Sequence, residues 1–313
     1  MSEIKINFVD FWTGFDKSNN YFFNLLSKKY TIIIDENPDL LFYSCFGEDY
    51  LKYNCTRIFY TGENIKPDYL GCDFAFSFQY DYHKKHFRLP LYSLYIDHHN
   101  MLNSLQTIEN KAKAVEIWKN KSKFCCMVVS NPNCPERIAF FHTLNKVKQV
   151  DSGGSVLNNV GGRVANKIDF IKDYKFVISF ENSSNDGYTT EKILEPISTN
   201  CIPIYWGNKL VDKDFNEKRF IDYNKFNTEK ELIDTILEID QNDTIAIEML
   251  MQPTFNENKI SHEEEHQIVL NILTEFIENP KKPIAQQFWS KIYIIKLRLL
   301  KIKKSLLNKI RWV

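Results

Sequence analysis

The chain lacks any apolar run of about 18 residues, the length at which a segment becomes a candidate membrane-spanning helix. Its first residues, MSEIKINFVDFW, lead directly into a predicted strand and show no apolar core of a signal peptide. Paired cysteine spacing is absent too, because the seven cysteines are an odd number and form no C-x-x-C. We therefore expect reduced core cysteines in a cytoplasmic protein without a signal peptide.

A net charge is also absent, since 40 basic residues balance 40 acidic ones. The charges are unevenly placed: residues 281–313 contain ten Lys or Arg and no Asp or Glu. The remaining 1–280 hold 30 basic and 40 acidic residues. A basic tail on an acidic body indicates one anionic partner surface rather than general nucleic-acid binding.

The tail has the spacing of an amphipathic helix, with apolar residues every three or four positions along one face. These residues are Phe288, Ile292, Ile295, Leu299, Ile302, Leu306, Ile310 and Val313, and basic residues fall elsewhere: Lys291, Arg298, Lys301 and Lys304. Because all its charges share one sign, we expect this helix to lie on an anionic membrane surface. The alternative is a helix that docks on the protein body or on a second copy.

What the sequence does contain is an alternation of short apolar runs and helical segments. The predicted strands are 4–12, 31–34, 40–45, 57–60, 73–78, 123–129, 176–180 and 201–206, and the predicted helices are 19–29, 135–146 and several within 229–278. Short buried strands separated by helices favour parallel sheets. We predict an α/β protein of two Rossmann-like halves with a cleft between them, joined by the polar segment 97–122.

The stretch 174–207, YKFVISFENSSNDGYTTEKILEPISTNCIPIYWG, carries the most functional information. An apolar strand ends at Glu181 and Asn182, a polar loop follows, and Tyr188, Glu191 and Lys192 mark the start of a helix. This order of strand, loop and helix forms the nucleotide pocket of α/β proteins. A helix N-terminus attracts phosphate, Lys192 adds a positive charge there, and Glu191 can accept hydrogen bonds from sugar hydroxyls.

With these residues, the chain resembles the α1,3/α1,4-fucosyltransferases of glycosyltransferase family 10. The resemblance lies in FEN, five residues, then Y-x-TEK at 180–192, followed by PIYWG at 203–207. FYTGEN at 59–64, SNPN at 130–133 with Arg137 after it, and DSGG at 151–154 agree in the same order. The match covers roughly 55–225, which is more specific than any single motif.

The resemblance implies a GT-B fold and an inverting transfer of L-fucose from GDP-fucose to a GlcNAc hydroxyl. Residues 1–118 would form the acceptor-side domain, 119–280 the donor-binding domain, and 281–313 the basic tail. The acceptor would be a cell-surface glycan, such as a lipopolysaccharide or capsule precursor, near the inner face of a bacterial membrane.

The resemblance also assigns roles to individual residues. Glu63 would be the general base, and the donor pocket would contain Arg137 and Lys192 on the diphosphate, Tyr188 and Glu191 on the fucose or ribose, and Asn182 and Glu181 beside them. It implies no required cofactor, with GDP-fucose as a substrate, and leaves stimulation by Mn²⁺ or Mg²⁺ open.

The chemistry of these residue types agrees with that assignment. Inversion at a sugar carbon needs one base for the acceptor proton and positive charge for the departing diphosphate. Glu63 follows an apolar strand, where ligands bind in parallel sheets. A glycosidase would instead need two carboxylates around the scissile bond.

Each candidate also has a structural alternative. Glu63 could cap a turn, Arg137 could be a surface arginine in the first turn of a helix, and Tyr188 could pack in the core. The helix dipole alone could stabilise the negative charge of Glu191. The same dipole destabilises the positive charge of Lys192, which argues for an anionic ligand there. Two other functions stay open: a transferase with a different nucleotide-sugar donor, and a non-catalytic binding protein, which would need no base.

Two metal-site patterns are present and are not expected to hold a metal. His262 and His266 match H-E-x-x-H, but the flanking residues are polar and no third ligand is evident, so a solvated helix fits better. Asp212 and Asp214 match D-x-D, and we interpret them as a turn near a helix start.

Overall fold

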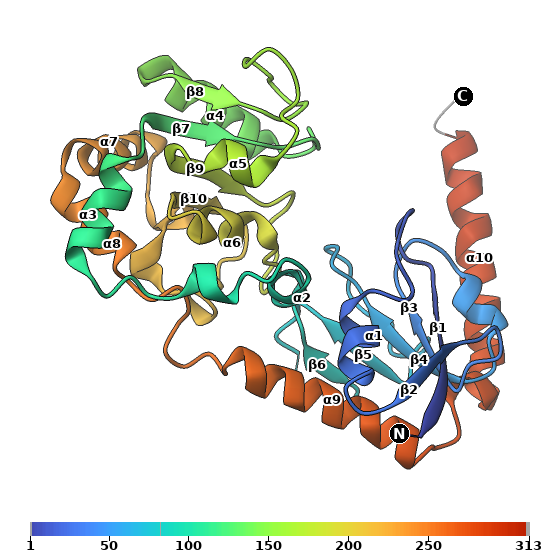
Figure 1. Cartoon of the computed structure of the whole chain (residues 1–313). Helices are drawn as coiled ribbons and strands as arrows, with labels where there is room; N and C mark the ends of the chain where they lie inside the picture. The colour runs from blue at the N-terminus through green and yellow to red at the C-terminus, as the bar shows by residue number, and fades with distance from the viewer. Residues whose placement is uncertain (1, 82, 311–313) are drawn as a thin grey trace. The chain divides into compact units, whose positions relative to one another are not determined.

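The computed structural model describes residues 2–81 and 83–310, with the backbone alone for 300–310. The chain divides into two compact units, described one at a time below. Unit 1 comprises Met1–Leu89 and Ile260–Val313, and unit 2 comprises Pro90–Lys259. Each unit contains one parallel sheet with helices packed against it (Figure 1).

Unit 1 is built on a six-stranded sheet of order β2-β1-β3-β4-β5-β6. Its strands are β1 (Glu3–Val9), β2 (Thr31–Ile34), β3 (Leu40–Tyr43), β4 (Thr56–Tyr60), β5 (Phe74–Ser77) and β6 (His86–Arg88). Its helices are α1 (Tyr21–Leu26), α9 (His262–Glu278) and α10 (Phe288–Ile310), with 3₁₀ turns η1 (Asp49–Lys52) and η6 (Ile284–Gln286). The central strands β3 and β4 are buried along their whole length, as expected for parallel strands covered on both faces.

Aromatic side chains fill much of the core of unit 1. The ring of Phe22, from α1, lies 4.8 Å from Phe42, 5.4 Å from Tyr60 and 5.5 Å from Phe76. Phe8 stacks on Phe42 at 5.0 Å. Such pairs add packing energy to their large buried area, so the ring contacts of Phe22 help to hold α1 on the sheet.

Unit 2 is built on a five-stranded sheet of order β11-β10-β9-β7-β8. Its strands are β7 (Lys123–Met127), β8 (Val150–Ser152), β9 (Tyr174–Phe180), β10 (Ile202–Trp206) and β11 (Ile221–Asp222). Its helices are α2 (Leu91–His98), α3 (Lys111–Lys119), α4 (Pro135–Val147), α5 (Lys167–Ile171), α6 (Glu191–Ser198), α7 (Glu229–Gln241) and α8 (Asp243–Leu250). Its 3₁₀ turns are η2 (Leu102–Leu105), η3 (Val211–Lys213), η4 (Glu217–Arg219) and η5 (Tyr223–Lys225). The two predicted α/β halves are thus both present as parallel sheets.

The segment 97–122, expected to link the halves, is instead part of unit 2. Trp118 on α3 is 1% exposed and its Nε1 donates to Asp243 at 2.8 Å. Lys121 is buried and donates to the backbone oxygens of Lys172 and Thr199. These buried contacts explain why unit 2 begins at Pro90, whereas the expected division between the two domains lay at residue 118.

Residues 260–313 return to unit 1, whereas the expected division assigned 260–280 to the donor-binding domain. On α9, Val269 and Leu273 are fully buried. Glu278 at its end accepts from the Tyr30 hydroxyl at 2.8 Å and pairs with Lys29 at 2.8 Å. The last helices therefore complete the first unit.

The tail forms the predicted helix α10, and it docks on unit 1 through one face. Tyr293 is 5% exposed, and its hydroxyl lies 3.2 Å from that of Tyr50. The predicted apolar face points elsewhere: Phe288, Ile292, Ile295 and Leu299 are 72%, 43%, 56% and 61% exposed. The side chains of Ile302, Leu306 and Ile310, and the whole of Val313, lie outside the described residues.

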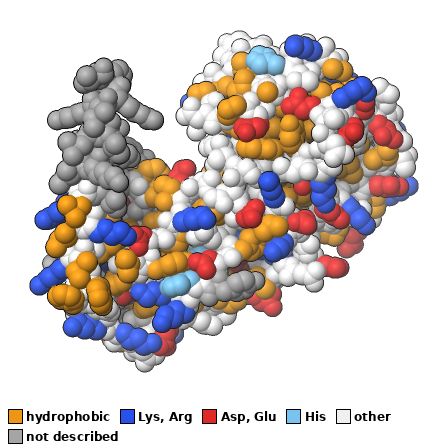
Figure 2. All heavy atoms as spheres, turned by 180° about the vertical axis from the view of Figure 1, so that it is seen from behind, with side chains coloured by type: hydrophobic (Ala, Val, Ile, Leu, Met, Phe, Trp, Pro, Cys, Tyr) orange, Lys and Arg blue, Asp and Glu red, His pale blue; other side chains and the backbone are white. Residues whose placement is uncertain are grey.

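Two further expectations concern cysteines and membrane spans. All seven cysteines are free thiols, and five of them are buried. Among the described residues, no helix combines the length and apolar character needed to cross a bilayer. On the face shown in Figure 2, basic and acidic side chains are interspersed over the described surface.

Candidate active site

The loop 181–190 joins the carboxyl end of β9 to the start of α6, as the sequence predicted. The Glu181 N–H donates to the Trp206 oxygen at 2.8 Å and so extends the pairing of β9 with β10. Thr190 is the N-cap of α6, and its hydroxyl accepts from the Lys192 N–H at 3.5 Å. The loop is therefore fixed by a backbone hydrogen bond at one end and by the side-chain cap of Thr190 at the other.

Glu181 is fully buried inside this loop. Its two carboxylate oxygens accept from the N–H and the hydroxyl of Thr190, each at 2.7 Å. Burial raises the pKa of Glu181 above its usual value, although Lys192 and the Thr190 hydrogen bonds oppose that rise. The side chain links the end of β9 to the start of α6.

Lys192 lies between two carboxylates. Its Nζ is 3.4 Å from Glu181 and 3.3 Å from Glu191, and it donates to the Thr190 hydroxyl at 3.1 Å. Burial lowers the pKa of Lys192, but the charges of Glu181 and Glu191 outweigh it, so the pKa lies above its usual value. The ammonium group is therefore charged, and 15% of the side chain is open to solvent.

Glu191 is the second partly open group at this helix start, with 20% of its side chain exposed. Burial raises its pKa, but Lys192 and Lys167 outweigh that effect, and the pKa lies below its usual value. Glu191 is therefore an ionised acceptor beside a cation, which suits a ligand that offers both hydroxyls and phosphate.

Arg137 lies in the first turn of α4, which begins with Pro135. It is fully buried, so the alternative of a surface arginine is wrong. Its guanidinium donates to the Phe180 oxygen at 2.9 Å, the Asn131 oxygen at 2.6 Å and the Asn182 Oδ1 at 3.3 Å. Burial lowers its pKa, yet an arginine in this range stays charged.

The positive charge of Arg137 is only partly compensated. Within the described chain, no carboxylate forms an ion pair with Arg137, and its buried Nε has no hydrogen-bond partner. Buried cations are costly without an anionic partner. The guanidinium of Arg137 therefore lies beside Asn182 at the carboxyl end of β9, next to Glu181 in sequence.

Tyr188 is buried, with 3% of its surface exposed. Its N–H donates to the Asn185 oxygen at 3.0 Å, which closes a tight turn within the loop. The neighbouring Gly187 has φ +88°, a conformation that favours glycine. The buried position of Tyr188 agrees with the alternative that this side chain packs in the core. Glu191 and Lys192, in contrast, remain partly open to solvent.

Asn208 is an important residue that the sequence analysis did not select. It is fully buried, and its Oδ1 accepts from the Gly187 N–H at 2.7 Å and the Leu210 N–H at 2.9 Å. Its Nδ2 donates to the Thr189 hydroxyl at 3.0 Å. Asn208 follows a glycine at the end of a predicted strand, and this position was the signal available in the sequence.

Gly207 allows the close approach of β10 to the site. It has φ +151°, and a Cβ there would lie 2.6 Å from the Glu181 Cγ. A larger residue would push the buried carboxylate out of place. The glycine at position 207 is therefore required by the position of Glu181.

Glu63 belongs to unit 1 and lies in the loop after β4, again at the carboxyl end of a strand. Its side chain is exposed, and its N–H donates to the Thr61 hydroxyl at 3.0 Å. Among the described residues, its carboxylate has no hydrogen-bond or ion-pair partner. The turn-cap alternative for Glu63 has no support in these contacts, and the carboxylate is open to a ligand.

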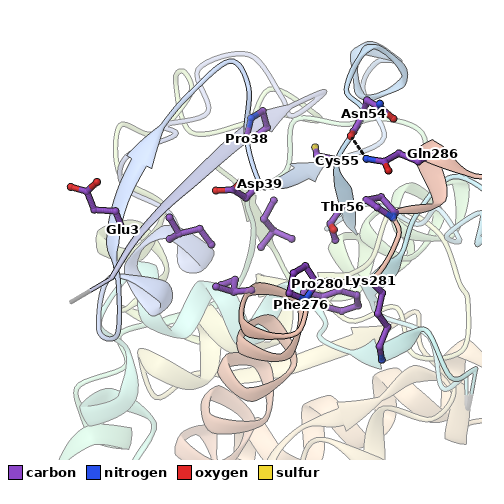
Figure 3. A pocket seen from close by; sticks show the side chains of 14 residues that line it. Glu3, Pro38, Asp39, Asn54, Cys55, Thr56, Phe276, Pro280, Lys281 and Gln286 are labelled. Carbon is purple, nitrogen blue, oxygen red and sulfur yellow. Dashed lines mark hydrogen bonds between the residues drawn. The ribbon is translucent and has the colours of Figure 1, made fainter.

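The other hollows and clusters do not coincide with these residues. A cavity of about 420 Å³ in unit 1 lies at the amino ends of β1, β3 and β4, lined by Asp39, Asn54 and Lys281 among others (Figure 3). This is the opposite edge of the sheet from Glu63. Between His262 and His266, Glu264 forms the capping box of α9, in which Ser261 and Glu264 exchange hydrogen bonds.

Two family profiles match most of the chain. A family profile for the N-terminal domain of the alpha-(1,3)-fucosyltransferase FucT matches residues 6–95. A second profile, glycosyltransferase family 10 (fucosyltransferase) C-term, matches residues 118–269.

Individual relatives give the same result. The Helicobacter pylori alpha-(1,3)-fucosyltransferase FucT is 35% identical over 271 residues, covering 76% of this chain and 57% of that protein. The chain thus spans little more than half the length of that relative. The Bos taurus 4-galactosyl-N-acetylglucosaminide 3-alpha-L-fucosyltransferase 9 is 31% identical over 134 residues, covering 41% of this chain and 36% of that protein.

Solved structures extend the likeness to the fold. A crystal structure of an alpha1,3-fucosyltransferase with GDP-fucose has a TM-score of 0.75 at 30% identity, covering 90% of this chain and 92% of that one. A structure of such an enzyme with GDP has a TM-score of 0.76, also at 30% identity, covering 91% and 93%. The predicted GT-B fold is confirmed by this likeness, and the chain belongs to glycosyltransferase family 10, the fucosyltransferases.

Proposed function

We propose that this chain transfers L-fucose from GDP-fucose to a hydroxyl of a GlcNAc-containing glycan, with inversion at the anomeric carbon. The observation that carries the proposal is the partly open Glu191–Lys192 pair at the start of α6, held by the buried Glu181. The similarity to alpha1,3-fucosyltransferases crystallised with GDP and GDP-fucose supports this choice of donor.

The donor diphosphate would bind where the positive charges of unit 2 gather. Lys192 would contact a phosphate oxygen directly, because its ammonium is charged and partly open. Glu191 would accept hydrogen bonds from fucose or ribose hydroxyls. Tyr188 and Glu181 would hold this loop in shape, since both are buried.

Arg137 would stabilise the charge of the diphosphate from its buried position. Its charge has no ion-pair partner in the described chain, so a bound diphosphate would supply the missing anion. Direct contact would require the Asn131 oxygen to release the guanidinium, because Arg137 is fully buried. Asn182, which accepts from Arg137, would line the same pocket.

Glu63 would be the general base of the reaction. Its exposed carboxylate would take the proton of the acceptor hydroxyl while that oxygen attacks the anomeric carbon. The bond from this carbon to the phosphate oxygen breaks, the electron pair leaves with GDP, and Lys192 and Arg137 stabilise the departing charge. These side chains provide the positive charge without a required metal; stimulation by Mn²⁺ or Mg²⁺ is compatible with the scheme.

A donor screen tests the proposed function. The purified chain would be incubated with N-acetyllactosamine and, in turn, GDP-fucose, GDP-mannose and UDP-glucose, and products would be identified by mass spectrometry and NMR. We expect a fucosylated product with GDP-fucose alone and an α-linkage formed from the β-linked donor. Transfer from another donor would show that the assignment of GDP-fucose as the donor is wrong. Binding of all donors without transfer would favour a non-catalytic binding protein.

We also propose that α10 holds the enzyme on an anionic membrane surface, where lipid-linked glycan precursors lie. The exposed side chains of Phe288, Ile292, Ile295 and Leu299 form one stripe, while Tyr293 docks the opposite face. Exposed Lys291, Lys296 and Arg298 flank the stripe. An apolar stripe bordered by cations suits the boundary between acyl chains and anionic headgroups.

Vesicle binding tests this surface. Replacing Phe288, Ile292, Ile295 and Leu299 by serine would reduce cosedimentation with phosphatidylglycerol vesicles about tenfold or more, since each buried CH₂ contributes about 0.8 kcal/mol. Activity on soluble N-acetyllactosamine would stay unchanged. The matched control is Tyr293→Phe, which alters the docked face alone, and equal sedimentation of the serine variant would refute the membrane role.

A further inference from the structure

The carboxyl edge of the sheet in unit 1 carries two exposed aromatic side chains, at the same edge as Glu63. Trp12 follows β1, Phe46 follows β3 and Glu63 follows β4. These three strands are parallel neighbours in the sheet (Figure 1). Their loops therefore leave the sheet side by side at one edge.

Hydrogen bonds join the three loops. The Phe46 N–H donates to the Asp10 oxygen at 3.0 Å, which ties the loop after β3 to the loop after β1. The Cys45 Sγ lies 3.3 Å from the Thr61 hydroxyl, which also accepts from the Glu63 N–H. Trp12, Phe46 and Glu63 are thus carried by one connected set of loops.

The backbone of these loops is fixed at some cost in strain. Asp10 has φ 60°, an unfavourable conformation for a residue other than glycine. Its carboxylate accepts from the N–H groups of Asp49 and Tyr50 at 2.9 and 2.8 Å. Gly47 leaves room for that carboxylate, because a Cβ there would lie 2.2 Å from the Asp10 Oδ1. Strain of this kind persists where the surroundings enforce it, often at functional sites.

The indole of Trp12 is held on one side and open on the other. Its ring contacts Phe15 edge-on at 5.0 Å and Phe11 at 5.8 Å, and these two rings stack at 4.1 Å. Phe15 in turn packs on the core residue Phe8 at 5.5 Å. Trp12 nevertheless remains 46% exposed. The core thus fixes an aromatic surface that it does not cover.

Phe46 adds a second open ring. It is 51% exposed and contacts no other aromatic ring among the described residues. Two exposed rings at the sheet edge that also carries the unpaired Glu63 carboxylate mark a candidate ligand surface. A pyranose matches both features, because it has an apolar C–H face and a rim of hydroxyls.

We propose that Trp12 and Phe46 form the acceptor-binding surface, on which a neutral pyranose of the glycan packs its C–H face and presents its hydroxyl to Glu63. The inference rests on the proposed function, because the oxygen of a general base must lie within about 2.6–3.2 Å of the hydroxyl oxygen whose proton it removes. The acceptor ring must therefore lie over the loops that carry Glu63. The two rings fix the position of that sugar, and Glu63 acts on it.

Kinetics of aromatic variants test the proposal. Trp12→Ala and Phe46→Ala would each raise the KM for N-acetyllactosamine about tenfold, since hot-spot aromatic residues carry much of a binding energy. The KM for GDP-fucose and the hydrolysis of GDP-fucose without acceptor would stay within about twofold. Trp12→Phe would retain most of the affinity, because a ring remains. Leu102→Ala is the matched control, as Leu102 has a similar exposure of 44% in unit 2.

A direct binding measurement separates this proposal from the proposed function. N-acetyllactosamine would be titrated by NMR into the GDP-saturated protein and its variants, with thermal unfolding as the check on folding. If wild type binds the glycan through Trp12 but transfers no fucose, the surface stands and the proposed function fails. If wild type transfers fucose and both alanine variants keep the wild-type acceptor KM and binding, the surface is refuted. Absence of glycan binding by wild type would refute both the acceptor surface and the proposed function. If one alanine variant misfolds, the acceptor KM and binding of the other variant decide the test.

Discussion

Lys192 carries the only partly open positive charge among the donor-site residues that the sequence predicted. Two carboxylates hold it in place, and the cap residue Thr190 accepts one of its hydrogen bonds. A cation at a helix start opposes the helix dipole. Its position is explained if an anionic ligand completes the site.

Removing this charge should weaken donor binding. We expect Lys192→Ala to raise the Kd for GDP about 10- to 100-fold, the range for a lost hydrogen bond to a charged group. Calorimetry with GDP measures it. The control is Lys192→Arg, which keeps the charge; an unchanged Kd in the alanine variant would contradict the assignment. Thermal unfolding distinguishes this effect from the cost of leaving Glu181 buried without its cation.

The sequence predicted the position of the loop 181–190 better than the contacts of the residues around it. Glu181, Asn182, Glu191 and Lys192 lie where the strand–loop–helix pattern placed them. Without the resemblance, the sequence left open that Arg137 is a surface arginine, because its burial depends on contacts such as the Phe180 oxygen, 43 positions further along the chain. Burial of this kind has no local signal.

At the scale of elements, the longer apolar strands and the helix that begins with Pro135 could be predicted. The strands β3, β4, β5, β7, β9 and β10 and the helix α4 follow their apolar runs closely. β6, β8 and β11 have three residues or fewer, too short for any periodicity to appear. α3 was interpreted as linker, because it contains three Lys and a Glu and only Ala114 and Trp118 on it are fully buried, while Val115 and Ile117 are partly buried against the core.

The end of α7 is fixed by a pH-sensitive ion pair. Asp240 is paired with Lys175 at 2.8 Å and with Lys148, which connects α7 to β9 and to the residue after α4. Burial raises the pKa of Asp240, but the hydrogen bonds and charges of the two lysines outweigh it, so the pKa lies below its usual value. A carboxylate with a lowered pKa stabilises the fold above the unfolded value of about 3.9, and this contribution is lost as the pH falls through the folded value.

Asp240→Asn should therefore destabilise the fold in a pH-dependent way. We expect a loss of about 1–2 kcal/mol in the free energy of unfolding at pH 7, and a smaller difference from wild type as the pH approaches 3. Denaturant unfolding at several pH values measures it. Asp234→Asn is the control, because its pair with Lys230 on the same helix is exposed. A difference that stays constant with pH would show that the charge is not responsible.

At the scale of the whole molecule, the order of the elements predicted two α/β halves but not the path of the chain. The return of 260–313 to unit 1 depends on contacts such as Tyr30 with Glu278, 248 positions apart in sequence. Amphipathic spacing showed that α10 has an apolar face, but not that Tyr293 would dock another face. Long-range packing decides these features, and sequence periodicity reports local burial alone.

The central claim is that Glu63 removes the acceptor proton in a transfer from GDP-fucose. The most direct test is the Glu63→Gln variant, which keeps the size of the side chain and removes the base. We predict that kcat for transfer to N-acetyllactosamine falls about 10²–10⁴-fold, the usual contribution of general base catalysis, while the Kd for GDP-fucose changes by less than about twofold. Wild-type turnover in the folded Glu63→Gln protein would contradict the account.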